Sequence, residues 1–191
     1  RLFPLPCVLC RQISDRSCQI CSQCYQTLPF KNQNLQCIVC GQSLSLHNAV
    51  CGQCQKLPPH FDSVWGVFDY DHAMKYLIAS FKFKQKSWAG KVLTQLWTEA
   101  LEKKVMVYPE ALIPVPLHWQ RHFKRGFNQS LILAQGLSRI LHIPYYHRAL
   151  IRQAATQPQS GLAFKHRKSN VKGAFKVKDL LEKANNLKKE K

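Results

Sequence analysis

Nine cysteines lie within the first 54 residues, and most of them form pairs separated by two residues. Eight of them make two sets of four, and each cysteine of the second set follows its counterpart by 30 positions. The sets are Cys7, Cys10, Cys21 and Cys24, then Cys37, Cys40, Cys51 and Cys54. Four thiolates on two short turns can bind one tetrahedral zinc ion, and soft sulfur ligands favour zinc over hard cations. The repeat C-x2-C-x10-C-x2-C therefore predicts two structural zinc sites in consecutive ribbons.

Three alternatives to two consecutive zinc sites are open at the level of sequence. A disulfide framework is disfavoured because the cysteine count is odd, CxxC pairs are typical of metal sites, and the first residues show no apolar core of a secretory signal. Ligation could interleave between the two sets, or Cys18 could replace Cys21 or Cys24 after a shift in register. His47 lies between the pairs of the second set and fits a solvated loop better than a ligand.

A second segment suited to chemistry follows a short apolar run at 111–115. Its cations and turn-forming residues are Arg121, Lys124, Arg125, Gly126 and Asn128. If 111–115 is a parallel strand, this segment joins the carboxyl end of the strand to the next helix, where open α/β sheets bind ligands. The N–H groups of a first helical turn suit an anion, arginine adds charge, and glycine permits close approach of the backbone. The pattern predicts phosphate binding, and a cationic turn without a ligand is the alternative.

The overall charge favours a polyanionic partner. Lys and Arg number 28 and Asp and Glu number 10, so the formal net charge is +18, which favours nucleic acid, phosphates or acidic lipid. Aromatic residues interleave with the cations, a pattern typical of proteins that stack bases and track phosphates of single strands. The nucleic-acid candidates are Lys82, Lys84, Lys86, Trp88, Lys165 and Lys168. Packing on a helix face is the alternative for the aromatic side chains, Phe81 above all.

Composition divides the chain into two parts. Pro58 and Pro59 break regular structure after the cysteine-rich segment, so we expect a double zinc-ribbon module over residues 1–56 and a second domain over 57–191. The first part has few large apolar residues and must rely on metal to fold. In the whole chain 46% of residues are hydrophobic, which excludes wholesale disorder, and no apolar run is long enough to span a bilayer.

The second part alternates the patterns of strands and helices. β-Branched and aromatic residues at 61–70 predict a strand. Apolar residues with helical spacing follow Asp71 and Ser87, which are the expected helix N-caps, and a third helix is expected from about Asn128. The unbroken apolar run at 111–115 is typical of a strand that is buried on both faces. This order of elements predicts an α/β domain with a parallel sheet.

Three segments carry a resemblance to a known family: FKFK at 81–84, PVPLHWQRHFKRGFNQS at 114–130, and residues 152–175, which include TQPQ and NVKGAF. Together they closely resemble the ComF/GntX family over essentially the whole chain. The resemblance implies an N-terminal cysteine-rich zinc module followed by a phosphoribosyltransferase-like domain. It further implies that 114–130 is the pyrophosphate-binding loop and 152–175 a mobile catalytic loop, on which Arg167 is the catalytic candidate.

The resemblance also implies a function in natural transformation. We expect a bacterial competence protein that acts in the uptake of single-stranded transforming DNA, in the cytoplasm or at the inner face of the cytoplasmic membrane, without spanning it. The expected ligands are single-stranded DNA and phosphoribosyl pyrophosphate or a nucleotide, with Mg²⁺ beside a pyrophosphate held by Arg121 and Arg125. Other competence proteins, such as a helicase or DNA-processing factors, are expected partners. An active phosphoribosyltransferase of nucleotide metabolism and a zinc-dependent docking adaptor are the alternatives.

One feature of phosphoribosyltransferases is missing from the sequence. These enzymes carry two adjacent acidic residues at the end of a strand, followed by a Thr- and Gly-rich loop that cradles the 5′-phosphate. After Asp71 the sequence has one further Asp, at Asp179, and it has no Gly after Gly173. We therefore expect the C-terminal part of the domain to lie beyond Lys191.

Overall fold

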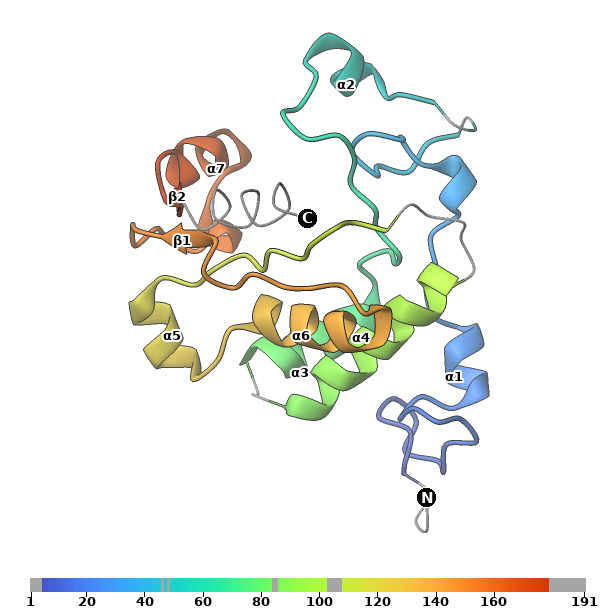
Figure 1. The fold of residues 1–191 in the computed structure, drawn as a ribbon. Coiled ribbons are helices and arrows are strands. Elements are labelled where there is room, and N and C mark those ends of the chain that lie inside the picture. The colour runs from blue at the N-terminus through green and yellow to red at the C-terminus, as the bar shows by residue number, and fades with distance from the viewer. Residues whose placement is uncertain (1–4, 46, 48, 84–85, 103–107, 179–191) are drawn as a thin grey trace, which may run out of the picture. The chain divides into compact units, whose positions relative to one another are not determined.

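The computed structural model describes residues 5–45, 47, 49–83, 86–102 and 108–178 (Figure 1). The chain forms two compact units, Arg1–Ala79 and Ser80–Lys191. The change in composition after residue 56 falls inside the first unit, so a separate module over 1–56 stays a prediction. Among the described helices, none is long and apolar enough to cross a membrane.

The first unit begins with two copies of one small fold. Each copy contains an isolated antiparallel bridge, between Pro6 and Ile13 in the first and between Gln36 and Ser43 in the second. In each copy the second cysteine pair begins just before a short helix. These helices are α1, Ser22–Gln26, and α2, Gly52–Lys56, and a 3-10 turn at Gln33–Leu35 lies between the copies. The sequence repeat is therefore also a structural repeat.

The strand predicted at 61–70 is wrong. One residue of this segment, Phe68, makes an isolated antiparallel bridge to Phe30, and the two rings pack with their centroids 4.7 Å apart. Residues 61–64 are exposed, and Val67 is the buried residue of the segment. The β-branched and aromatic composition produces a bridge but no strand, because a strand also needs a partner along its length.

The three helices predicted from apolar spacing are confirmed. They are α3, His72–Phe83, α4, Ser87–Glu102, and α6, Gln129–Leu141. The Asp71 carboxylate accepts a hydrogen bond from the Met74 N–H at 3.2 Å, and the Asn128 side chain accepts one from the Ser130 N–H at 3.0 Å. Both residues therefore act as N-caps, as the sequence predicts for Asp71, whereas Ser87, the other expected N-cap, is the first residue of its helix.

The backbone of α6 approaches α4 closely at Gly136. A Cβ atom at this position would lie 2.7 Å from the Cγ2 of Thr94, whose hydroxyl donates to the Gly90 carbonyl at 2.9 Å. A Cβ atom at Gly90 would lie 2.8 Å from the ring of Phe81. Phe81 is only 2% exposed. Packing on a helix face is therefore confirmed for Phe81, and its ring is not available to stack a base.

The described residues do not form the predicted parallel sheet. The run at 111–115 makes a parallel bridge between Leu112 and Tyr145, outside any named strand. Ile113 and Val115 are 44% and 53% exposed, so the prediction of a strand buried on both faces is also wrong. A buried parallel strand needs a neighbour on each side along its length, and in the described part of the chain this run has one short bridge.

The regular sheet in the described residues of the second unit is antiparallel. β1, Leu150–Arg152, pairs with β2, Phe175–Val177, so that Leu150 lies opposite Val177 and Arg152 opposite Phe175. Three short elements occur in the segments 114–130 and 152–175, which the family resemblance implies to be loops. They are α5, Trp119–Arg125, a 3-10 turn at Gln159–Gly161, and α7, Phe164–Val171.

Candidate zinc centres and arginine site

Each cysteine set gathers its four sulfur atoms into one cluster. The clusters are Cys7, Cys10, Cys21 and Cys24, and Cys37, Cys40, Cys51 and Cys54. Within a cluster all sulfur atoms lie within 4.8 Å of one another, and those of Cys10 and Cys21 are 3.6 Å apart. A tetrahedral zinc ion with bonds of about 2.3 Å holds its sulfur ligands about 3.8 Å apart. The clusters therefore fit two structural zinc ions that are ligated by consecutive ribbons, and interleaved ligation is excluded.

The electrostatics of the clusters favour a bound cation. Backbone N–H groups of Cys40 and Cys51 lower the pKa of Cys37 to about 6, whereas burial and the neighbouring sulfur atoms raise the pKa of Cys54 to about 12. In the first cluster burial acts to raise the pKa of Cys7, but backbone N–H groups outweigh it and bring this pKa down to about 6. Four crowded thiolates repel one another, and a divalent metal ion that binds all four removes this repulsion.

Each ribbon reverses direction directly after the first CxxC pair. The residue at this point has a left-handed backbone in both copies, with φ of 68° at Arg11 and 69° at Gly41. Its N–H donates to the carbonyl of the first cysteine of the pair, at 2.8 Å to Cys7 and 2.9 Å to Cys37. This tight turn brings both cysteines of the pair to the same cluster.

The left-handed position predicts opposite effects of substitution in the two ribbons. A left-handed backbone costs a residue with a Cβ about 1 kcal/mol relative to glycine, so Arg11→Gly should stabilise the first ribbon by about that amount. Gly41→Ala should destabilise the second ribbon, because it adds this cost and places the new Cβ 2.9 Å from the Val64 carbonyl oxygen. Titration with a competing chelator should show later zinc release for Arg11→Gly and earlier release for Gly41→Ala. Identical chelator sensitivity of the two variants would contradict the prediction.

Cys18 and His47 stand outside both clusters. Cys18 is 5% exposed, and its thiol donates to the Ile20 carbonyl at 3.5 Å. The first cluster contains Cys21 and Cys24 instead, so the alternative of a shifted register is excluded. His47 is exposed and belongs to neither cluster, as expected of a solvated loop residue.

The predicted phosphate-binding residues lie on and around α5. Arg121 is half-buried, and its Nη2 donates to the Thr156 carbonyl at 2.5 Å. Gly126 ends the helix with a left-handed backbone, φ 75°. The Asn128 side chain caps α6 and donates to the Val115 carbonyl at 3.1 Å. The Arg121 side chain therefore connects α5 to a segment 35 positions along the chain.

Sequence reasoning missed two residues at this place, Arg152 and Thr156. Arg152 ends β1, and its Nη2 donates to the Thr156 hydroxyl, so two guanidinium groups meet at one residue. We call Arg121 and Arg152 the arginine pair. Burial and the positive charge of Arg121 lower the pKa of Arg152, and its buried Nε has no hydrogen-bond partner in the described residues.

One sequence signal points to the region that holds the arginine pair, although it does not single out the two arginines. The 68 positions 111–178 contain no Asp or Glu. Cations that the fold brings together within this stretch cannot be neutralised by a carboxylate of the same stretch. An anion from another source is therefore the natural counterion for two half-buried arginines.

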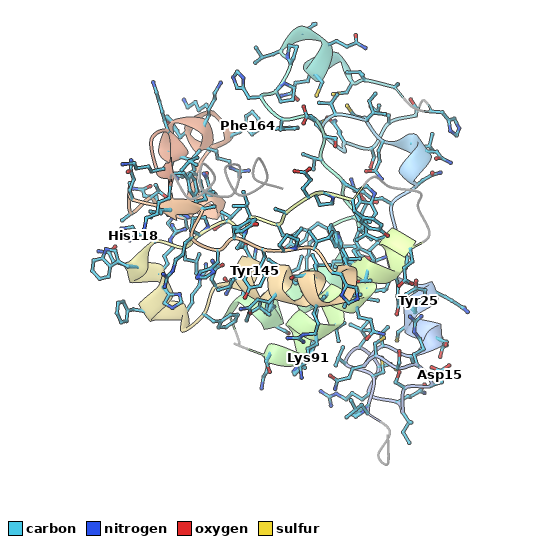
Figure 2. The ribbon with its side chains drawn as sticks, viewed as in Figure 1. Asp15, Tyr25, Lys91, His118, Tyr145 and Phe164 are labelled. Carbon is cyan, nitrogen blue, oxygen red and sulfur yellow. The ribbon has the colours of Figure 1, made fainter. Side chains whose placement is uncertain are left out.

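The catalytic candidate Arg167 lies on the exposed surface of α7. Its Nε donates to the Leu162 carbonyl at 3.2 Å, so it is held within its own segment. Gln157 and Asn170 exchange two hydrogen bonds, of 3.2 and 3.1 Å, which attach the segment after β1 to α7. Figure 2 labels Phe164 at the start of this helix and His118 at the start of α5. The segment from β1 to α7 is thus folded, with Thr156 facing the arginine pair.

The other residues predicted to bind nucleic acid or phosphate are distributed over several elements of the second unit. Those with exposed side chains are Lys82, Lys86, Lys165 and Lys168. Trp88 on α4 and Arg125 at the end of α5 are half-buried. Lys84 and the side chain of Lys124 lie outside what the structure describes. A role of these residues in binding nucleic acid stays a prediction.

Comparisons with known proteins agree with the zinc clusters. A family model described as a double zinc ribbon domain matches residues 1–55. Competence protein F of Haemophilus influenzae is 32% identical over 183 residues, which are 92% of this chain and 77% of that protein. DNA utilization protein YhgH of Escherichia coli (strain K12) is 33% identical over 175 residues, or 90% of this chain and 70% of the relative.

A shorter match reaches Competence protein ComFC of Bacillus subtilis, which is 33% identical over 81 residues, 41% of this chain and 32% of the relative. No solved structure matches the chain. The similarity to Competence protein F and YhgH extends over both units, and the ribbon pattern agrees with both cysteine clusters. With its two four-cysteine ribbons and these relatives, the chain belongs to the ComF family of competence proteins.

Proposed function

We propose that this protein handles single-stranded transforming DNA during competence, in the cytoplasm or at the inner face of the cytoplasmic membrane. The names of its relatives, a competence protein and a DNA utilization protein, support a role in DNA uptake and use. The observation that carries the proposal is the arginine pair, which converges on Thr156 in a stretch without acidic residues.

The arginine pair suits a phosphate group. Two like charges that are brought together and partly desolvated raise the free energy of the folded protein, and burial together with Arg121 lowers the pKa of Arg152. A phosphate oxygen placed between the two forks would neutralise both and accept several charge-assisted hydrogen bonds. The orphaned Nε of Arg152 is one donor that such an anion would satisfy. The phosphates of a DNA backbone provide this chemistry at every nucleotide.

The same site would serve a phosphoribosyl ligand. We propose that the second unit is part of a phosphoribosyltransferase-like domain, which the parallel bridge between Leu112 and Tyr145 supports. Arg121 and Arg125 would then hold the pyrophosphate of phosphoribosyl pyrophosphate or a nucleotide, and Mg²⁺ would supply further positive charge. Arg167, on the segment after β1, is the candidate to approach the ligand. Under this proposal nucleotide binding and DNA handling use one basic surface.

Removal of the arginine pair should change the salt dependence of DNA binding. For a single strand, each lost phosphate contact should reduce the slope of log affinity against log salt by about 0.7. We therefore expect Arg121→Ala, Arg152→Ala to lower the slope by about 1.4 and to weaken binding to all sequences alike. Fluorescence anisotropy of a labelled oligonucleotide at several salt concentrations measures this slope.

Two control variants separate local contacts from other effects. Arg139→Ala, Arg148→Ala removes the same charge from two exposed arginines, and Thr156→Val removes the hydroxyl on which Arg152 converges without a change of charge. Both should keep most of the wild-type slope. If the variant Arg139→Ala, Arg148→Ala had the same salt slope as the variant Arg121→Ala, Arg152→Ala, the proposal would be contradicted. Loss of phosphoribosyl pyrophosphate binding with an unchanged DNA slope would instead assign the site to the small ligand.

A further inference from the structure

Helix α5 has an inverted polarity, which means that it buries a cation and exposes its large aromatic side chains. Arg121 is half-buried and directed to Thr156, whereas Trp119 and Phe123 are 62% and 82% exposed. On most surface helices the large apolar residues face the core and the cations face water. Each aromatic side chain could bury about 150–250 Å² if it were turned inward. The exposure of two such residues, four positions apart on one helix face, points to a ligand that covers them.

The two exposed rings form one ordered pair. The centroids of Trp119 and Phe123 are 6.1 Å apart and their planes are inclined by 84°, an edge-to-face arrangement. The Trp119 ring also lies against the His118 ring, with the centroids 5.6 Å apart, and His118 is only 7% exposed. His118 therefore supports Trp119 from the protein side. We call Trp119 and Phe123 the α5 aromatic pair.

We infer that the α5 aromatic pair is a stacking platform for the bases of single-stranded nucleic acid. This inference rests on the proposed function and names the part of the DNA that this helix contacts. Every base has a flat apolar face, so stacking on tryptophan and phenylalanine accepts any sequence. A duplex hides these faces within its own stack, which restricts the platform to single strands.

The charge around the α5 aromatic pair favours single-stranded nucleic acid as its ligand. The α5 aromatic pair lies within 111–178, the stretch that has no Asp or Glu. An apolar protein surface rimmed by both signs of charge would match such a patch poorly, whereas a strand that carries a flat ring and a negative phosphate in each unit matches it well. On one helix, Arg121 is available for phosphate and the two rings are available for bases. The inverted polarity of α5 follows from this division.

Comparison of two strands of equal length tests the platform: an oligothymidylate and its abasic counterpart, which has the same backbone charge. Wild-type protein should bind the base-bearing strand more tightly. Trp119→Ala, Phe123→Ala should lose about tenfold or more in affinity for this strand, the loss expected for one or two unstacked bases, with little change for the abasic strand. Its salt slope should equal that of the wild type, because no phosphate contact is removed.

Matched variants sharpen the test. Trp119→Phe, Phe123→Tyr keeps two aromatic rings and should retain the affinity. Tyr70→Ala removes a ring that is 65% exposed but lies between Asp69 and Asp71, and it should bind both strands like the wild type. The arginine-pair variant should lower the salt slope for both strands, so that a failure of the platform and a failure of the phosphate site give different results.

Three outcomes would overturn the inference. The wild type could bind both strands equally, the aromatic-pair variant could weaken both strands alike, or neither strand could bind, which would also remove the proposed function. Sedimentation of the free protein tests another occupant, a second copy of this chain. A wild-type dimer that Trp119→Ala, Phe123→Ala converts to a monomer would assign the α5 aromatic pair to self-association and reject the platform.

Discussion

Removal of zinc by a strong chelator is expected to unfold residues 7–54 while the helices of the Ser80–Lys191 unit stay folded. Among the described residues of this segment, the buried large aliphatic side chains are Ile20 and Leu28. Each contributes about 1.5–3 kcal/mol by burial. A structural zinc ion contributes about 10–16 kcal/mol to the folding of a small ribbon. Metal binding is therefore the dominant source of stability in both ribbons.

Two measurements on the full chain check this prediction. Elemental analysis should find close to two zinc ions per chain before chelation. Hydrogen exchange after chelation should show complete loss of protection in peptides from 7–54 and retained protection in α4 and α6, where Leu96 is fully buried and Gly136 meets Thr94. If the ribbons kept their protection from hydrogen exchange without metal, the result would support the alternative of a disulfide framework. Loss of protection in α4 would show that the second unit depends on the first.

The zinc clusters could be predicted from sequence because all four ligands of a site lie within 18 residues, Cys7–Cys24 and Cys37–Cys54. A spacing of two residues between cysteines fixes a local turn, and the tetrahedral coordination of zinc fixes how two such turns come together. Helices α3, α4 and α6 were predictable for a similar reason, since one periodic face and a cap such as Asp71 are local features. Sequence could not decide whether Phe81 stacks a base or fills the core, because Gly90 creates its site from another helix.

The sheet and the arginine pair depend on long-range partners, and both were missed. The run at 111–115 and the segment at 61–70 have strand-like composition, but each forms a single bridge. Strand formation requires a neighbouring strand, which composition does not reveal. Arg121 meets Thr156 across 35 positions, so no spacing rule connects them. The absence of acidic residues between them was the available signal, and it becomes informative when the fold shows which cations converge.

Cys21→Ser is expected to reduce the zinc content from two ions to one per chain, whereas Cys18→Ser should leave it at two. The two residues lie three positions apart and both are buried, at 6% and 5% exposure. The Cys21 sulfur belongs to the first cluster, while the Cys18 thiol bonds to a carbonyl of its own loop. A hydroxyl replaces a thiol as a hydrogen-bond donor but is a poor ligand for a structural zinc site. Comparison of the two variants therefore separates the loss of a zinc ligand from the change of a buried cysteine.

The second ribbon allows the same test of zinc ligation. Cys51 is the counterpart of Cys21 in the second ribbon, so Cys51→Ser should also leave one zinc ion per chain, and the double variant Cys21→Ser, Cys51→Ser should leave none. Hydrogen exchange should show that each single variant unfolds its own ribbon and preserves the other, because the four ligands of a cluster come from one copy. Loss of both ions from a single variant would mean that the two ribbons fold as one cooperative unit. Retention of two ions in Cys21→Ser, with loss on further change of Cys18, would show that Cys18 can enter the first site.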